Sequence, residues 1–134
     1  MKLLLDTHIL LWALNDNPKL PKKAKDLILE DDNEIYYSTA SVWEITIKHM
    51  AKPERIKISG KEMSDLCVKM GYRMLPIVDD HVKKLESLVF QNQYQTHNDP
   101  FDRIMIAQAK AESMMFVTHD AKIPFYHEAC ILEV

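Results

Sequence analysis

The sequence predicts a three-layer α/β/α sandwich with a central parallel sheet of four to five strands. Short apolar or β-branched segments alternate with longer segments of helical periodicity, which is the pattern of parallel strands joined by helices. The first segment, Leu3–Leu5, is apolar at every position, as in a central strand covered on both faces. The chain of 134 residues has the usual size of one domain, so we expect a single domain over residues 1–134.

Two helices and a second strand follow. A helix is predicted from His8 to Leu14, because a cluster of Asn, Asp and Pro residues breaks the chain after it. Pro21 suits the first turn of another helix, where the missing N–H of proline leaves no hydrogen bond unmade. Glu34–Ser38 combines β-branched and aromatic residues after an Asp/Asn turn, and this composition predicts a strand.

The middle of the chain continues the alternation. Thr39–Ala51 and Lys61–Met70 are predicted helices, and Gly71 suits the position just beyond the end of the second one. Arg73–Val78 is a predicted third strand. Because proline lacks a backbone N–H, Pro76 restricts this strand to the edge of the sheet or marks its end.

The last third of the chain predicts two helices and two strands. A helix is predicted over Asp79–Phe90, followed by a polar loop over Gln91–Asn98. Asp99–Glu112 begins with an Asp-Pro pair, which favours the start of a helix. Met114–Thr118 is the predicted fourth strand and Cys130–Val134 a short fifth.

The composition argues against several classes of protein. The chain contains only 2 glycines, so neither a P-loop nor a dinucleotide-binding loop is predicted. The formal net charge of −3 is unlike that of a protein that coats duplex DNA. The apolar run at the N-terminus is far too short for a signal peptide or a membrane span, and we expect a soluble, cytoplasmic protein without membrane contact.

Four acidic residues fall at one predicted edge of the sheet. Asp6 ends the first strand and Asp120 follows the fourth. Glu44 and Asp102 lie near the starts of two helices, and right-handed crossovers bring helix starts to the edge where parallel strands end. Ligands gather at this carboxyl edge of open parallel sheets, so we expect the four carboxylates to lie close together.

Ionised carboxylates that lie within a few ångströms of one another repel, and they must take up protons or hold a divalent cation. An all-oxygen set without a Cys or His partner suits Mg²⁺ or Mn²⁺ far better than zinc. Such a metal activates water and neutralises charge on a phosphoryl oxygen. The cluster therefore predicts hydrolysis of phosphodiesters.

Each acid also has a purely structural explanation. Asp6 and Asp120 suit the turns that follow strands, and Glu44 fits a capping box that Ser41 opens. Asp99 is best explained as the N-cap of its helix, and the acid three residues later faces the positive helix end. The convergence of the four acids on one edge, and not any single acid, predicts a functional site.

Four motifs carry a resemblance to a known family, in order and over nearly the whole chain. They are Leu3–His8, Ser41–Ile45, His97–Ala109 and Val117–Asp120. Together they resemble the VapC-like PIN-domain toxins of type II toxin–antitoxin systems. The stretch from Asp99 to Ala109 is the most specific part. Two departures lie outside the four acids: Asn98 replaces a basic residue, and Ala51-Lys52 replaces a glycine-containing helix end.

The resemblance implies a Mg²⁺- or Mn²⁺-dependent endoribonuclease that cleaves RNA, binds a cognate antitoxin protein and forms a homodimer. The family's acidic tetrad corresponds to Asp6, Glu44, Asp102 and Asp120. The implied metal ligands are Asp6, Asp102 and Asp120. Glu44 then completes the metal shell or orients the attacking water. Residues with an expected secondary role are Asp99, Thr118 and Thr7.

Four side chains beside the acids are candidates for contact with RNA: Lys48, Arg103, His8 and His119. For Lys48, an ion pair with Glu44 one turn earlier is the simpler explanation. The histidines show no metal-ligand spacing. Trp12, Trp43 and the methionines are assigned to the core or to a partner contact rather than to base stacking.

Residues near the acids argue against two families of phosphoryl-transfer proteins. A haloacid-dehalogenase-like phosphatase needs a second acid two residues after Asp6, where His8 stands. A response-regulator receiver needs a lysine after a late strand, and Thr118–Asp120 contains none. A PIN nuclease of RNA maturation and a catalytically silent PIN binding module remain the alternatives to a toxin.

Overall fold

Five strands form the central sheet of the computed structural model, which describes residues 1–134. The strands are β1 (Lys2–Leu5), β2 (Glu34–Ser38), β3 (Arg73–Leu75), β4 (Met115–Thr118) and β5 (Ile131–Glu133). Their order across the sheet is β3-β2-β1-β4-β5. Every neighbouring pair is parallel, so the predicted parallel sheet is confirmed.

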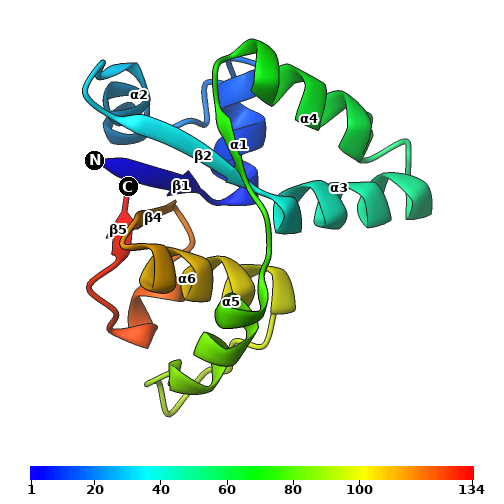
Figure 1. The fold of residues 1–134 in the computed structure, drawn as a ribbon. Coiled ribbons are helices and arrows are strands. Elements are labelled where there is room, and N and C mark those ends of the chain that lie inside the picture. Colours follow the sequence, from blue (N-terminus) through cyan, green and yellow to red (C-terminus); the bar gives the residue numbers. More distant parts are fainter.

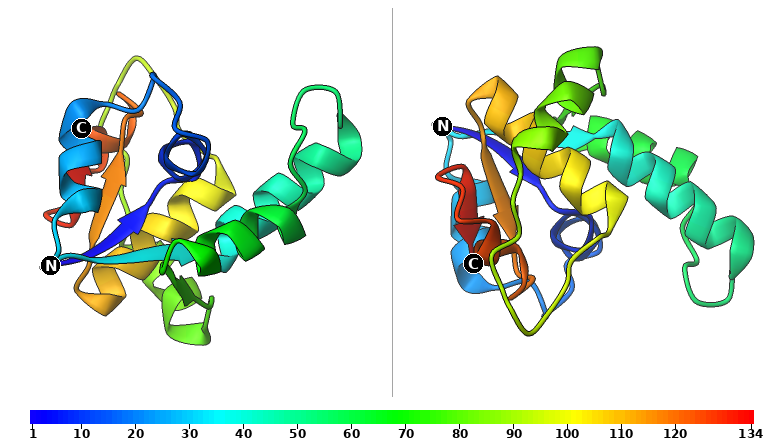
Figure 2. Two further views of the ribbon diagram at one scale, coloured as in Figure 1. Left: turned by 90° about the horizontal axis from the view of Figure 1, so that it is seen from above. Right: turned by 90° about the horizontal axis from the view of Figure 1, so that it is seen from below.

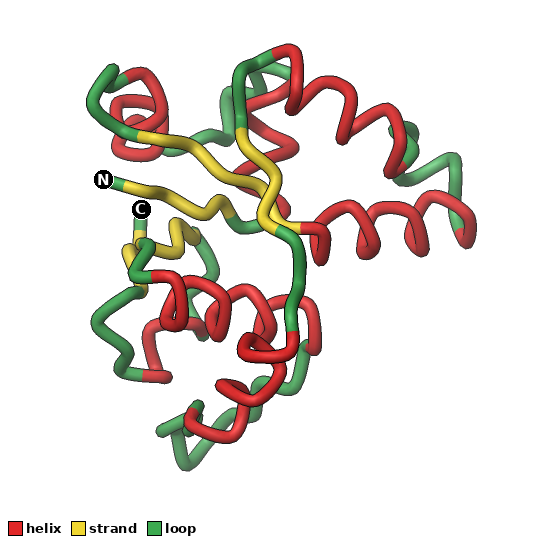
Figure 3. The backbone as a smooth tube through the Cα atoms, in the orientation of Figure 1, coloured by secondary structure: helices red, strands yellow, loops and turns green.

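Helices cover both faces of this sheet (Figures 1 and 3). They are α1 (Thr7–Leu14), α2 (Lys22–Leu29), α3 (Thr39–Ala51), α4 (Gly60–Lys69), α5 (Asp79–Lys84) and α6 (Pro100–Glu112), with the short 3-10 helices η1 (Leu85–Ser87) and η2 (Ile123–Tyr126). Helices α1, α2 and α4 pack on one face, and α6 with α5 against it packs on the other. This is the predicted three-layer sandwich. No helix combines the length and the apolar character needed to cross a lipid bilayer.

The leucines of β1 contribute to both cores. Leu4 packs with Phe116 of β4 and Met105 of α6 on one face of the sheet. Leu3 and Leu5 belong to the core on the other face, with residues of α1, α2 and α4. A central strand needs apolar side chains on both faces, which explains the uninterrupted apolar run.

The edge strand β3 is shorter than predicted. It ends at Leu75, one residue before Pro76, rather than at Val78. Its place at the edge of the sheet agrees with the restriction that proline imposes, because the missing N–H faces no neighbouring strand.

The helix predicted over Asp79–Phe90 is wrong beyond Lys84. Helix α5 ends there, η1 adds one 3-10 turn, and Leu88 has extended backbone angles. The hydroxyl of Ser87 donates to the carbonyl of Lys84 (2.7 Å), and such local hydrogen bonds compete with a continuing helix. The turn away from the helix buries Leu88 in the core beside α6.

Helices α3 and α4 pack side by side and extend away from the sheet (Figure 2). The outer side of α3 is apolar and exposed, since Trp43, Ile47 and Met50 are 57%, 45% and 78% exposed. Trp43 is therefore not a core residue. Its ring makes an edge contact with Phe101 of α6, with 5.1 Å between the ring centroids.

The segment after β4 contains η2, which the sequence does not predict. This short helix buries Ile123 and Tyr126. The N–H of Gln91 donates to the carbonyl of Phe125 (2.9 Å), which joins η2 to the loop that precedes α6. The loop and η2 thereby meet beside the start of α6.

Candidate active site

Asp6 lies where β1 ends and α1 begins, and its side chain is 1% exposed. Its N–H donates to the carbonyl of Val117 in β4 (2.9 Å), which continues the parallel pairing of the two strands. Oδ1 accepts a hydrogen bond from the N–H of Thr7 (2.7 Å), and Oδ2 accepts one from the hydroxyl of Thr118 (2.7 Å). Both oxygens of Asp6 are therefore held at the carboxyl edge of the sheet.

Burial raises the pKa of the Asp6 carboxyl group from 3.8 to about 7. The hydrogen bonds from Thr118 and Thr7 oppose this rise, because they favour the charged form. The negative charges of Glu44 and Asp120 add to it.

Glu44 lies in the second turn of α3 and is buried. Its Oε1 accepts from the hydroxyl of Thr7 (2.8 Å), and its Oε2 accepts from the ammonium group of Lys48 (2.5 Å). The alternative of a capping box with Ser41 is wrong, because the N-cap of α3 is Ser38. Ser41 instead shares a hydrogen bond with the hydroxyl of Thr7 (2.8 Å).

Asp102 lies in the first turn of α6, three residues after Asp99. Oδ1 of Asp99 accepts the N–H of Asp102 (3.0 Å), so Asp99 is the N-cap of this helix, as predicted. Burial raises the pKa of Asp102 to about 7. The charges of Asp6 and Asp99 raise it further, and a hydrogen bond with His97 opposes the rise.

Asp120 follows β4 and is partly buried. Its N–H donates to the hydroxyl oxygen of Thr118 (3.1 Å), and its Oδ1 accepts the N–H of Lys122 (2.9 Å). It therefore shapes the turn after the strand. One potential ligand atom from each of His97, Asp102 and Asp120 lies within 4.8 Å of the others.

The structure thus brings four acids together at the carboxyl edge of the sheet. Thr7 joins the first two through hydrogen bonds, and Thr118 joins the first and the last. The donor atoms are carboxylate and hydroxyl oxygens, which are the ligands of hard divalent cations. A cation would offset both the burial of charge and the added repulsion between carboxylates that raise the pKa values of Asp6 and Asp102. The carboxylates of Asp6, Glu44, Asp102 and Asp120 fit a divalent metal, and the ligand atoms within 4.8 Å of one another come from His97, Asp102 and Asp120.

The side chains predicted to contact substrate already have partners in the protein. Nε2 of His8 lies 3.7 Å from Oδ2 of Asp6, and burial lowers the pKa of this histidine. Nδ1 of His119 contacts the carbonyl of the C-terminal residue (2.5 Å). Nη1 of Arg103 donates to the hydroxyl of Tyr126 (3.1 Å), and its guanidinium carbon lies 5.7 Å from the centroid of that ring.

Two residues that lie beside the acids are not predicted from the sequence to have a role in the site: His97 and Tyr126. Nε2 of His97 lies 3.0 Å from Oδ2 of Asp102, and Nδ1 lies 2.7 Å from the hydroxyl of Tyr126. The available signal is the position of His97 just before the helix that carries Asp102. No pattern in the sequence pairs it with Tyr126, because η2 is not predicted.

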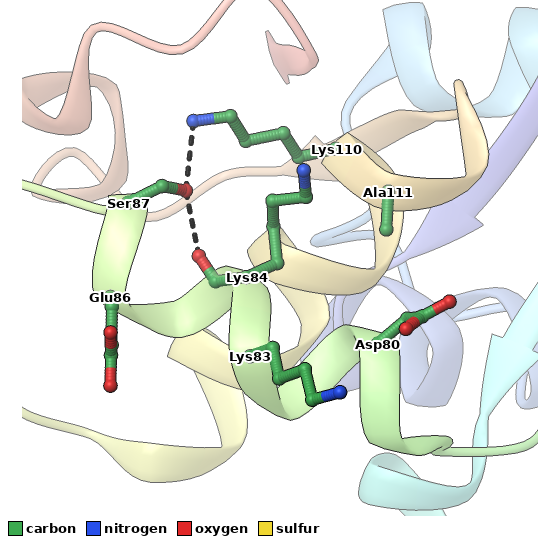
Figure 4. Close-up of a pocket in the computed structure, with 7 residues that line it drawn as sticks. All are labelled: Asp80, Lys83, Lys84, Glu86, Ser87, Lys110 and Ala111. Atoms are coloured by element: carbon green, nitrogen blue, oxygen red, sulfur yellow. Dashed lines mark hydrogen bonds between the residues drawn. The ribbon is translucent and has the colours of Figure 1, made fainter.

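A surface hollow of about 600 Å³ lies between α5, η1 and α6 and is rich in lysine (Figure 4). Lys110 donates to the hydroxyl of Ser87 (3.0 Å) and to Glu128 (2.8 Å). Lys83 forms an ion pair with Asp79 (2.9 Å). None of the four acids lines this hollow, so it is separate from the candidate active site.

Several solved structures share this fold. VapBC2 from Rickettsia felis bound to a DNA fragment from their promoter contains a chain that is 17% identical, with a TM-score of 0.69 over 100% of this chain and 98% of that chain. A chain of FitAcB from Neisseria gonorrhoeae is 19% identical, with a TM-score of 0.60 over 98% of this chain and 96% of that chain. A chain of a toxin–antitoxin complex from Klebsiella pneumoniae is 17% identical, with a TM-score of 0.57 over 98% of this chain and 98% of that chain. No curated protein matches the sequence.

The family is shown by a second comparison. The family model described as PIN domain matches residues 3–127, which include β2, β3, β4, all of β1 except Lys2, and all four acids. The structural likeness agrees with this match over the whole fold. The chain belongs to the PIN domain family.

Proposed function

We propose that the chain is a Mg²⁺- or Mn²⁺-dependent endoribonuclease and the toxin of a type II toxin–antitoxin pair. The observation that carries the proposal is the convergence of four carboxylates on one edge of the sheet, with Asp6 and Asp102 both at a pKa of about 7. Groups perturbed in this way, in a cluster built from separate elements, are typical of functional sites.

The proposed metal ligands are Asp6, Asp102 and Asp120. Thr7 and Thr118 fix the oxygens of Asp6, so that little rearrangement is needed to bind a cation. When bound, a divalent cation supplies an activated water and neutralises charge on the scissile phosphate. Glu44 is held by Thr7 and Lys48, which suits it to orient that water by accepting a hydrogen bond.

Substrate phosphates need positive charge beside the acids, and Lys48 is the best-placed candidate. Its side chain is 52% exposed and its ammonium group already lies at Glu44. Arg103 retains further donors besides the one that binds Tyr126, since a guanidinium group carries five N–H bonds. His8 and His119 are also proposed to contact RNA, and they flank the ring of Trp12 at 5.2 and 6.1 Å between centroids.

The proposed partners are a cognate antitoxin protein and a second copy of the chain. The antitoxin is supported by the toxin–antitoxin complexes that share the fold. The homodimer is supported by the exposed apolar side of α3, formed by Trp43, Ile47 and Met50. Side chains of this kind, gathered on one helix face, favour contact with another protein.

The nuclease proposal is tested by a cleavage assay on purified protein with RNA and single-stranded DNA of the same sequence. Wild type is expected to cut RNA with Mg²⁺ or Mn²⁺, and a chelator is expected to abolish cleavage reversibly. Asp6→Asn should be inactive although folded. Asp26→Asn is the matched control, because Asp26 is an exposed residue of α2 paired with Lys22. Cleavage that resists the chelator, an active Asp6→Asn variant, or cleavage of DNA alone would overturn the proposal.

The toxin proposal is tested separately by inducing expression in growing bacteria. Wild type is expected to arrest growth, and Asp6→Asn is expected to be tolerated at the same protein level. A nuclease of RNA maturation predicts specific processing of one RNA without growth arrest. Mapping of cut sites in total RNA distinguishes these outcomes and names the substrate.

A further inference from the structure

His97 is the buried member of an otherwise exposed loop. In the loop between η1 and α6, residues 91–99 are exposed or partly exposed except for His97. Its ring packs against Phe90, with 5.9 Å between centroids, and against Tyr126 at 5.5 Å. Burial of a polar ring requires partners for both nitrogens, and both have them.

The hydrogen bonds of His97 define which nitrogen carries the proton. The ionised carboxylate of Asp102 accepts only, so toward this form Nε2 donates to Oδ2 (3.0 Å). In a neutral ring, Nδ1 is then the acceptor for the hydroxyl of Tyr126 (2.7 Å), which also lies 3.2 Å from the carbonyl oxygen of His97. The hydroxyl oxygen in turn accepts from Nη1 of Arg103 (3.1 Å). The result is a directed chain of hydrogen bonds from Arg103 through Tyr126 and His97 to Asp102.

We propose that His97 is a positioning residue, which acts through Asp102 and is itself oriented by Tyr126. This role rests on the proposed function: the imidazole holds the Asp102 carboxylate through Oδ2, in the orientation in which that group would bind a divalent cation. Through Tyr126, the orientation of Asp102 depends on η2, which lies after the last acid in the sequence.

A direct metal ligand is the competing role for His97, since its ring nitrogen lies within 4.8 Å of the ligand atoms of Asp102 and Asp120. The hydrogen bonds favour positioning. Nε2 faces Asp102 and Nδ1 faces Tyr126, so neither nitrogen has a lone pair available to a cation without loss of a contact. The two roles predict different effects of glutamine, whose amide can replace the N–H donor at Nε2 but is a poor substitute for an imidazole ligand.

The test measures binding of Mn²⁺ alone by titration calorimetry, together with cleavage as a function of Mn²⁺ concentration. His97→Ala is expected to weaken Mn²⁺ binding by about tenfold, as loss of a hydrogen-bonding partner of a metal ligand does. His97→Gln is expected to restore affinity to within a few-fold of wild type. Tyr126→Phe, which keeps the ring and removes the hydroxyl, should give an intermediate loss. At saturating Mn²⁺, the His97→Ala variant should recover most of its cleavage rate.

His81→Ala is the matched control for loss of a buried histidine. His81 is also buried and bonded on both nitrogens, to the N–H of Val78 (3.1 Å) and to Glu112 (2.8 Å), but it lies in α5 beside the C-terminal end of α6. Its variant should melt at a lower temperature and bind Mn²⁺ like wild type. Unchanged Mn²⁺ affinity in both His97→Ala and Tyr126→Phe would overturn the inference, as would a His97→Gln variant no better than His97→Ala.

The failure of this inference is distinguishable from failure of the proposed function. If wild type binds Mn²⁺ and Asp6→Asn does not, the metal site stands, and the His97 variants decide the positioning role alone. If wild type neither binds Mn²⁺ nor cleaves RNA, the proposed function fails and the positioning role fails with it. Should His97→Ala not fold, the Tyr126→Phe and His97→Gln variants decide the question, because both keep side chains of similar volume in the core.

Discussion

The hydroxyl of Thr118 donates a hydrogen bond to Oδ2 of Asp6 at 2.7 Å, across the boundary between β4 and β1. The hydroxyl oxygen of Thr118 also accepts the N–H of Asp120 (3.1 Å), so one threonine joins the first and the last acid of the cluster. Thr118 is fully buried, and its hydroxyl is the only charge-stabilising side-chain donor that acts on Asp6. The ionisation of Asp6 therefore depends on this residue.

Replacement of Thr118 by valine removes the hydroxyl and keeps the shape of the side chain. A hydrogen bond to a charged group contributes about 1.5–3 kcal/mol, so the pKa of Asp6 should rise by about one unit or more. The midpoint of the pH profile for Mn²⁺ binding is expected to move upward by that amount, with about tenfold weaker binding at neutral pH. Thr118→Ser keeps the donor and should behave like wild type. Equal midpoints for wild type and Thr118→Val would contradict the role assigned to the hydroxyl.

Stability without metal is expected to fall as pH rises through the window from about 4 to about 7. The folded-state pKa of Asp6 is raised above its ordinary value of 3.8, so within this window the folded chain binds more protons than the unfolded chain. Raising the pH then disfavours the folded state. Asp6→Asn removes this penalty, and its melting temperature in chelator should exceed that of wild type by more at about pH 8 than at about pH 5.

Added Mn²⁺ should raise the melting temperature of wild type more at the higher pH, because the cation binds the ionised carboxylates. Thermal melts at both pH values, with chelator and with Mn²⁺, provide the measurement. The difference between wild type and Asp6→Asn isolates this group from the other titrating residues. A difference that does not change with pH would show that Asp6 is ionised at both values.

Those parts of the fold with a local signal could be predicted from the sequence. The uninterrupted apolar run Leu3–Leu5 indicates a strand that is buried on both faces, and the Asp99-Pro100 pair marks the start of α6. The turn at Ser87 could not be predicted, because it depends on the burial of Leu88 against a helix formed later in the chain. Trp43 could not be assigned to the surface from the sequence, because an apolar helix face has the same residue pattern whether the core or another protein covers it.

The candidate site likewise contains residues that could be predicted from the sequence and residues that could not. Asp6 and Asp120 follow strands, and parallel topology brings strand ends to one edge, so their approach follows from element order alone. His97 lies in a loop, where no periodicity reports which side chain points inward. Its contact with Tyr126 spans 29 residues and rests on η2, whose sequence carries no regular pattern. Side-chain networks that join loops are decided by packing, which periodicity does not encode.

Gly60 permits the close packing of α4 against α3. A Cβ at this position would lie 1.8 Å from Oγ1 of Thr46 and 2.8 Å from the carbonyl of Val42. Gly60→Ala is therefore expected to destabilise the fold by about 1–3 kcal/mol, the usual range for overpacking. Urea denaturation measures the change. The double variant with Thr46→Ala should recover part of the loss, because it removes the nearer contact and leaves the carbonyl in place.

Gly71→Ala is the control for Gly60→Ala. Gly71 has a φ of +82°, and a Cβ there would meet nothing within 4 Å. Its substitution is expected to cost about 1 kcal/mol through backbone conformation alone, and no change at Thr46 should relieve it. Rescue of Gly71→Ala by Thr46→Ala would show that the recovery does not come from local packing.

Asp99 and Asp102 are one helical turn apart, and their structural surroundings predict opposite behaviour on conversion to asparagine. Asp99 is exposed and caps α6 through its side-chain oxygen, a task that asparagine performs about equally well. Asp99→Asn should keep both stability and cleavage, whereas Asp99→Ala should lose about 1 kcal/mol of stability.

Asp102 is half-buried among other acids, so Asp102→Asn should keep or raise the melting temperature in chelator while Mn²⁺ binding and cleavage are lost. Calorimetry, melting curves and the cleavage assay on these three variants separate the helix cap from the metal ligand. An inactive but stable Asp99→Asn variant beside an active Asp102→Asn variant would reverse the two assignments.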